Sequence, residues 1–125
     1  MSDKLMKLPG GDHPITVHRN PKRVVVRLRG KVIADTTEAL TLREANYPPV
    51  QYIPRRDVDM IALERSEACS YCPYKGDASY FSIVVSGEPS VDAIWSYETP
   101  YLVVGEIKGH LAFYPERVDQ IEERD

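Results

Sequence analysis

Hydrophobic and polar residues alternate most clearly in the stretch that follows Pro21. Between residues 24 and 29, apolar residues recur at every second position, with arginines at two of the positions between them. A period of two is typical of a strand with one buried face. Gly30 and Lys31 then form a plausible turn into the apolar run 32–34. The pattern therefore predicts a hairpin with strands over residues 24–29 and 31–35.

Further short apolar runs, separated by prolines and glycines, predict strands over residues 50–53, 79–86, 91–97 and 109–114. The segment 35–44 is ambiguous. Asp35 with Glu38 three positions later resembles the capping box of a helix start, but the apolar residues that follow alternate. We interpret this segment as a turn followed by a strand. The acidic tail from Pro115 is expected to close with one helical turn.

This arrangement predicts a mainly β fold: a compact single domain of small coiled antiparallel sheets, barrel-like, with short helical turns. A length of 125 residues fits one domain. Residues 1–20, rich in Pro, Gly and polar side chains, predict a partly ordered N-terminal arm with a short extended piece at 13–17. Residues 21–125 are expected to form the single β domain.

Charge and composition narrow the classes of partner. The net charge of −3 argues against a general nucleic-acid binder, for which a basic surface is expected. The distribution is uneven, because residues 1–31 hold eight Lys or Arg against two acids. No stretch approaches the roughly 18 apolar residues of a membrane helix, and the charged first residues lack the apolar core of a secretory signal. We therefore expect a cytoplasmic protein with no membrane partner.

The densest cluster of reactive side chains is Cys69-Ser70-Tyr71-Cys72-Pro73-Tyr74-Lys75-Gly76, which holds both cysteines of the chain. The spacing Cys69-x-x-Cys72 is found in zinc knuckles and in dithiol redox pairs. A structural zinc needs four ligands and there is no second cysteine pair, so we expect free thiols, no metal and no cofactor. Lys75 lies near enough in sequence to favour a Cys72 thiolate, which makes these two the candidate catalytic residues. We expect Cys72 to be partly exposed, and an exposed Lys75 to contribute little to stability.

Two other groups of residues suggest chemistry. Asp57-Val58-Asp59 has the spacing with which nucleotidyltransferases hold divalent cations, although two acids beside Arg55 and Arg56 also fit a salt-bridged surface turn. Trp95 and Tyr97 fall on one face of a predicted strand. Aromatic walls with a few polar groups describe a small-molecule pocket, and they describe the core of a small domain equally well.

Several motifs are spread over nearly the whole chain: His13-Pro14-Ile15, Ile33-Ala34-Asp35-Thr36, Tyr47-Pro48-Pro49 through Tyr52-Ile53-Pro54-Arg55, Asp57-Val58, Cys72-Pro73-Tyr74-Lys75-Gly76-x-Ala78-x-Tyr80, Trp95-Ser96-Tyr97 and Phe113-Tyr114-x-x-Arg117-Val118. In this order they resemble those of a bacterial family catalogued as domain of unknown function 427, sometimes labelled nucleotidyltransferase-like. Cys72 and Lys75 fall within the matching motifs, whereas Cys69 and Asp59 do not. The resemblance implies a β-tent-like fold, similar to the corresponding domains of methionine-R-sulfoxide reductases and of cereblon, without their metal-binding cysteines. It implies no established activity.

The leading hypothesis is a domain that binds a small ligand, anionic or carbonyl-bearing, in an aromatic pocket next to Cys72 and Lys75. Two alternatives stay open. One is an enzyme, either thiol-based through Cys72 or a metal-dependent nucleotidyltransferase through Asp57 and Asp59. The other is a protein-interaction module that uses the basic hairpin 27–31. The sequence leaves the oligomeric state open, and the expected ligand-binding residues are Tyr52, Arg55, Cys72, Lys75, Tyr80, Trp95 and Tyr97.

Overall fold

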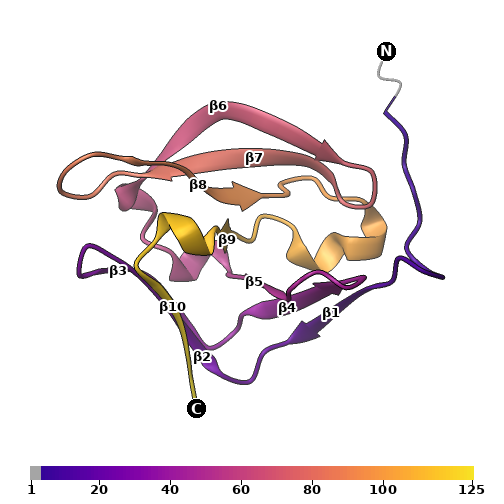
Figure 1. Cartoon of the computed structure of the whole chain (residues 1–125), viewed down its shortest axis with the longest axis horizontal. Helices are drawn as coiled ribbons and strands as arrows, with labels where there is room; N and C mark the ends of the chain where they lie inside the picture. The colour runs from indigo at the N-terminus through magenta and orange to yellow at the C-terminus, as the bar shows by residue number, and fades with distance from the viewer. Residues whose placement is uncertain (1–3) are drawn as a thin grey trace.

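A computed structural model describes residues 4–125 of the chain. Its ten strands form three antiparallel sheets, ordered β1-β4-β5, β10-β2-β3 and β6-β7-β8-β9. Figure 1 shows the four-stranded sheet as one layer, with the two three-stranded sheets facing it. The strands are β1 (Ile15–Arg19), β2 (Arg23–Leu28), β3 (Lys31–Thr36), β4 (Leu40–Glu44), β5 (Val50–Tyr52), β6 (Leu63–Cys72), β7 (Gly76–Ile83), β8 (Ser90–Ser96), β9 (Ala112–Phe113) and β10 (Gln120–Arg124).

The helical segments of the described chain are all short 3-10 turns: η1 (Arg55–Asp57), η2 (Met60–Ala62), η3 (Leu102–Ile107) and η4 (Pro115–Arg117). None of them is long or apolar enough to cross a membrane. The prediction of a mainly β fold of small antiparallel sheets with short helical turns is confirmed, and the described strands do not close into a barrel.

The predicted hairpin is β2–β3, with Leu28 paired to Lys31 across the turn. Both turn residues have positive φ, 51° at Arg29 and 78° at Gly30, as a tight two-residue hairpin turn requires. The strand expected within residues 35–44 is β4, so the capping-box pattern at Asp35 starts no helix. Asp35 instead accepts hydrogen bonds from Arg23 on the neighbouring strand, at 2.7 Å from Nε and 2.5 Å from Nη2.

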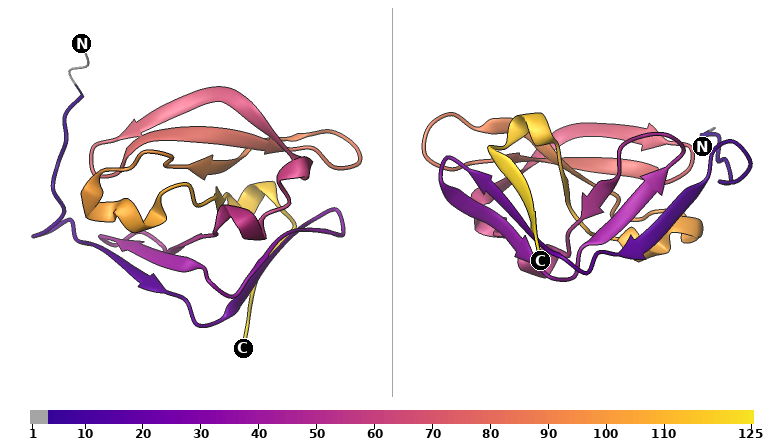
Figure 2. Two further views of the ribbon diagram at one scale, coloured as in Figure 1. Left: turned by 180° about the vertical axis from the view of Figure 1, so that it is seen from behind. Right: turned by 60° about the horizontal axis from the view of Figure 1, so that its bottom comes forward.

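Three strands were not expected from the sequence. The extended piece at 13–17 continues to Arg19 as β1, which pairs with β4 along its whole length. After the helical turn η4, the acidic tail forms β10 and pairs with β2. The third, β6, is a mostly exposed edge strand, so its side chains show no alternating pattern of burial. In Figure 2 the yellow strand β10 runs to the C-terminus beside β2, from which it is far removed in sequence.

The buried residues form two clusters. One lies between the four-stranded sheet and β2–β3 and includes Val26, Ile53 and Phe113. The other lies beside β4 and β5 and includes Leu42, Tyr52 and Tyr97. The bridge between Ile53 and Leu111, with a backbone hydrogen bond of 2.8 Å in each direction, links β5 to the segment before β9.

Candidate functional site

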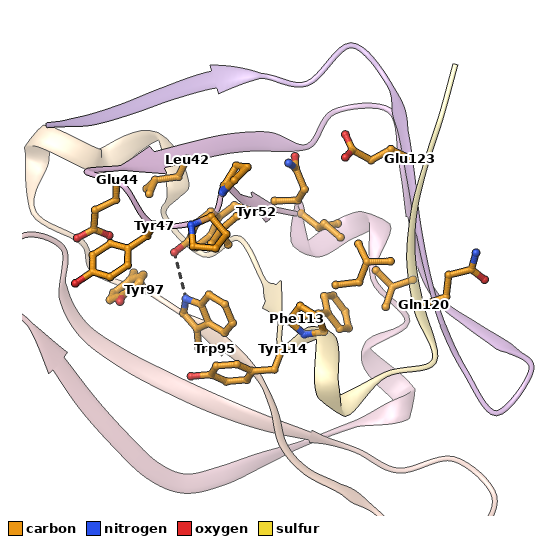
Figure 3. A pocket seen from close by; sticks show the side chains of 18 of the residues that line it. Leu42, Glu44, Tyr47, Tyr52, Trp95, Tyr97, Phe113, Tyr114, Gln120 and Glu123 are labelled. Carbon is orange, nitrogen blue, oxygen red and sulfur yellow. Dashed lines mark hydrogen bonds between the residues drawn. The ribbon is translucent and has the colours of Figure 1, made fainter.

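A cavity of about 790 Å³ opens between the two core clusters, and residues of both line it. Its walls come from β2, β4, β5, β7, β8, β9 and β10, from the turn between β6 and β7 that holds Lys75, and from the loop that holds Tyr47, Pro48 and Pro49. This volume is within the usual range for small-molecule sites. Figure 3 shows the side chains converging on it. Seven aromatic residues contribute: Tyr47, Tyr52, Tyr80, Trp95, Tyr97, Phe113 and Tyr114.

Trp95 lies at the centre of this aromatic group (Figure 3). Its indole Nε1–H donates a hydrogen bond of 3.1 Å to the hydroxyl of Tyr52, and the two rings meet edge to face. Tyr114 lies against the indole on another side, with ring centroids 4.4 Å apart. Because the indole is held by Tyr52 and Tyr114, the wall that it presents to the cavity is preorganised.

Three tyrosines of this wall, Tyr52, Tyr97 and Tyr114, stay protonated at neutral pH. Burial raises the pKa of Tyr52 and of Tyr97 far above that of a free phenol. Burial and a hydrogen bond with Tyr80 raise the pKa of Tyr114 to about 12. Tyr97 is 7% exposed, and among residues 4–125 its hydroxyl forms no hydrogen bond, so it is free to donate to a group inside the cavity.

At one end of the cavity, a carboxylate lies between two cationic or basic side chains. Glu44 accepts hydrogen bonds from Lys75 Nζ and from His13 Nε2, the second at 2.7 Å. Burial alone would raise the pKa of Glu44, but these hydrogen bonds outweigh it, so that the pKa lies below its ordinary value. The His13 ring also stacks on Tyr74, with centroids 4.0 Å apart. The N-terminal segment therefore helps to hold one wall of the cavity.

Elsewhere in the lining, a buried amide orients two polar groups. Asn20 is 5% exposed, and its Nδ2 donates to Gln51 Oε1 at 3.0 Å and to Glu123 Oε1 at 2.7 Å. Thr41 Oγ1 donates to the same Gln51 oxygen at 2.8 Å. Both Gln51 and Glu123 line the cavity. They come from β5 and β10, so this network forms only when two sheets are in place.

The structure brings five of the seven expected ligand-binding residues together. Tyr52, Lys75, Tyr80, Trp95 and Tyr97 all line the cavity. The other two, Arg55 and Cys72, are not part of its lining.

Lys75 is 6% exposed, so the expectation of an exposed lysine is wrong. It follows the turn at Pro73, and Gly76 after it has a φ of 112°, which other residues rarely adopt. This backbone directs Lys75 inward. Its ammonium hydrogen-bonds Glu44 and lies 5.8 Å from the centroid of the Tyr97 ring. Activation of Cys72 by Lys75 therefore has no support from the hydrogen bonds of the described chain.

Cys69 and Cys72 are free thiols, the first exposed and the second partly buried, as expected for Cys72. Both lie on β6, in a stretch that pairs regularly with β7. Three residues along a regular strand span about 10 Å and put the side chains on opposite faces. A disulfide needs Cα atoms closer than about 7 Å. This geometry does not fit a dithiol pair.

The two aspartates considered for metal binding have separate partners. Asp57 accepts a hydrogen bond of 2.7 Å from Thr36 Oγ1, and Asp59 forms an ion pair of 3.2 Å with Lys31. Across residues 4–125, no group of three or more His, Cys, Asp or Glu side chains is placed to hold a metal ion. The salt-bridged turn is therefore seen only in part: Asp59 is ion-paired with Lys31, whereas Asp57 forms no ion pair within residues 4–125. Arg55 and Arg56 pair with Glu98 and Glu38 instead.

Arg55, outside the cavity, belongs to an ion-pair network with Glu98. Its Nη2 is 3.1 Å from Glu98, and its Nε donates to the Gly109 carbonyl at 3.2 Å. Arg65 donates to both oxygens of the same carboxylate, at 2.8 and 2.9 Å. The hydrogen bonds from Arg65 are the main reason why the pKa of Glu98 falls to about 2.

This network predicts an acid-dependent loss of stability. The pKa of Glu98 is lower in the folded chain than its ordinary 4.5, so its contribution is complete above pH 4.5 and declines as the pH falls towards 2. We expect Glu98→Gln to cost roughly 1–2 kcal/mol at pH 7, reduced by solvent screening at this partly exposed group. Urea unfolding at pH 7 and pH 3 measures this. A difference between wild type and variant that stays the same at both pH values would contradict it.

Several lining residues were not expected from the sequence, notably Glu44, Gln51, Phe113 and Glu123. Phe113 and Tyr114 stand in one of the quoted motifs, which was a signal for the aromatic part. Nothing in the local sequence singled out Glu44, Gln51 or Glu123. Glu44 and Glu123 hydrogen-bond to residues 31 and 103 positions away, and Gln51 bonds to Asn20, 31 positions away, as well as to the nearer Thr41.

Comparison with known protein families identifies the chain. The profile of the family described as domain of unknown function DUF427 matches residues 16–124. The chain therefore belongs to this family, as its motifs predicted. A search of curated proteins finds no significant match.

Proposed function

We propose that this DUF427 domain binds a small organic molecule in the aromatic cavity around Trp95. The observation that carries the proposal is the cavity itself, about 790 Å³ in volume, with seven aromatic side chains and a few oriented polar groups in its lining. Side chains that fill a core pack without voids of this size. The aromatic rings are held by one another and by the Trp95–Tyr52 hydrogen bond, so a ligand would order few side chains on binding.

The polar groups indicate how a ligand would be oriented. The Tyr97 hydroxyl, which is neutral and free to donate, suits a carbonyl or hydroxyl oxygen. An anionic ligand has less support, because the positive charges expected to attract it are already paired. Lys75 is paired with Glu44 and Arg55 with Glu98.

The enzyme alternatives have less support than binding. Cys72 is absent from the cavity lining, and Asp57 and Asp59 are engaged by different partners. The basic hairpin is also partly neutralised, since Lys31 is paired with Asp59. Two free cysteines that are poorly placed to form a disulfide fit a reducing compartment, and we propose the cytoplasm.

Thermal-shift screening against a library of metabolite-sized compounds tests the proposal. A ligand at a hundredfold excess over its Kd stabilises the protein by about 2.7 kcal/mol. We expect at least one compound to raise Tm in the wild type and to lose this effect in Trp95→Leu. The control is Tyr71→Leu, since Tyr71 lies outside the cavity and should leave the response intact. Compounds that stabilise the Trp95→Leu variant as well as the wild type would refute the cavity as the site.

A further inference from the structure

We infer that the ligand of this cavity carries a positively charged nitrogen, an inference that rests on the proposed function. The charged residues of the lining are three carboxylates and one ammonium. Glu44 and Lys75 pair with each other, which leaves Asp119 and Glu123 as carboxylates on the wall. Neither of these two forms an ion pair with any cation of the described chain.

Glu123 faces the cavity by its position on β10. It pairs with Val24, and Ile121 two residues earlier pairs with Val26. Since alternate residues of a strand share a face, Glu123 points to the same side as the cavity residue Ile121. Glu122 points to the opposite side, where it accepts hydrogen bonds from Arg124 at 2.8 and 3.0 Å.

The surroundings of Glu123 hold it in place without neutralising it. The buried amide of Asn20 donates to one carboxylate oxygen at 2.7 Å. Lys22, two residues after Asn20, forms its ion pair with Asp125 and not with Glu123. An amide hydrogen bond orients a carboxylate but leaves its negative charge in place. The structure therefore places at the edge of the cavity an exposed carboxylate that an amide orients and that forms no ion pair with a cation of the described chain.

Aromatic rings complete the conditions for binding a cation. The negative face of an indole or phenol ring attracts an ammonium within about 6 Å of its centroid. The cavity already contains one such contact, because the Lys75 ammonium lies 5.8 Å from the Tyr97 centroid. Trp95, Phe113 and Tyr114 offer further rings in the same lining as Glu123 (Figure 3).

Three small probes with the same phenyl ring separate charge from shape. They are benzyltrimethylammonium, benzyl alcohol and benzoate. Trp95 is the single tryptophan of the chain and lines the cavity, so its fluorescence reports each titration. We expect benzyltrimethylammonium to bind about tenfold more tightly than benzyl alcohol, and benzoate to bind more weakly than either.

Two variants of the same strand locate the effect. Glu123→Gln should reduce the preference for the cation over benzyl alcohol to about threefold or less. Glu122→Gln removes the same charge from the opposite face of β10 and should keep the tenfold preference. A loss of preference in both variants would show a long-range charge effect and would overturn the assignment to Glu123.

The remaining outcomes also decide the inference. Equal binding of the cation and the alcohol, with a Trp95 response to both, would overturn the cationic ligand and leave small-molecule binding supported. Tighter binding of benzoate would do the same in favour of an anion. If none of the probes binds, the cationic inference fails, while the library screen with Trp95→Leu still decides the proposed function separately.

Discussion

Replacing Lys75 by methionine is expected to destabilise the fold by about 3 kcal/mol. The ammonium is buried and is hydrogen-bonded to Glu44, whose side chain is only 15% exposed. Removing one partner of a buried ion pair leaves the other charge without compensation, which typically costs 3–5 kcal/mol. His13 still forms a hydrogen bond with Glu44 in the variant, which reduces the loss of stability, so we expect a cost at the lower end of this range. Urea unfolding at pH 7 measures the change.

The double variant Glu44→Gln/Lys75→Met distinguishes pairing from packing. It should be more stable than Lys75→Met alone, because no unpaired carboxylate remains. Lys31→Met is the matched control, since Lys31 has a single acidic partner, Asp59, and is half exposed. Its expected cost is below about 1 kcal/mol. Equal costs for Lys75→Met and Lys31→Met would contradict the buried pair.

Replacing Phe113 by alanine is expected to cost about 3–4 kcal/mol and to enlarge the cavity. Phe113 is 4% exposed, belongs to the first core cluster and also lines the cavity. Phenylalanine-to-alanine changes in cores typically cost 3–5 kcal/mol, depending on how far the surrounding residues can collapse into the space left. Urea unfolding gives the change in stability.

Val91→Ala is a control for that change, because Val91 lies on β8 with 54% of its surface exposed. Its expected cost is below about 1 kcal/mol. If Phe113→Ala costs as little as Val91→Ala, then Phe113 is not part of a continuous core at the cavity wall.

Local sequence patterns were sufficient to predict the strands that have one buried and one exposed face. The β2–β3 hairpin could be predicted because apolar residues alternate and Gly30 supplies a positive φ. The strand β6 could not be predicted, since most of its residues are exposed and one edge of it carries no partner strand. The sequence of β10 resembles an acidic tail without a strand pattern, and its strand conformation depends on its pairing with β2.

The aromatic half of the site was also visible in the sequence. Trp95 and Tyr97 are two residues apart, and a strand places such residues on one face. The charged half depends on contacts between distant segments. Lys75 meets Glu44 across 31 residues, and Asn20 meets Glu123 across 103. No local pattern specifies such pairs. The choice between an anionic and a cationic ligand therefore depends on contacts that exist only in the folded chain.

The most direct test of the cavity as a binding site is the NMR signal of the Trp95 indole N–H. The chain has one tryptophan, so a 15N-labelled sample gives a single indole signal, from the group that donates to Tyr52. On titration with the tightest compound from the screen, this signal and the backbone amides of Gln51 and Tyr52 should shift together with one Kd. An unchanged indole signal, with shifts confined to the exposed Leu102 and Val103, would contradict the account.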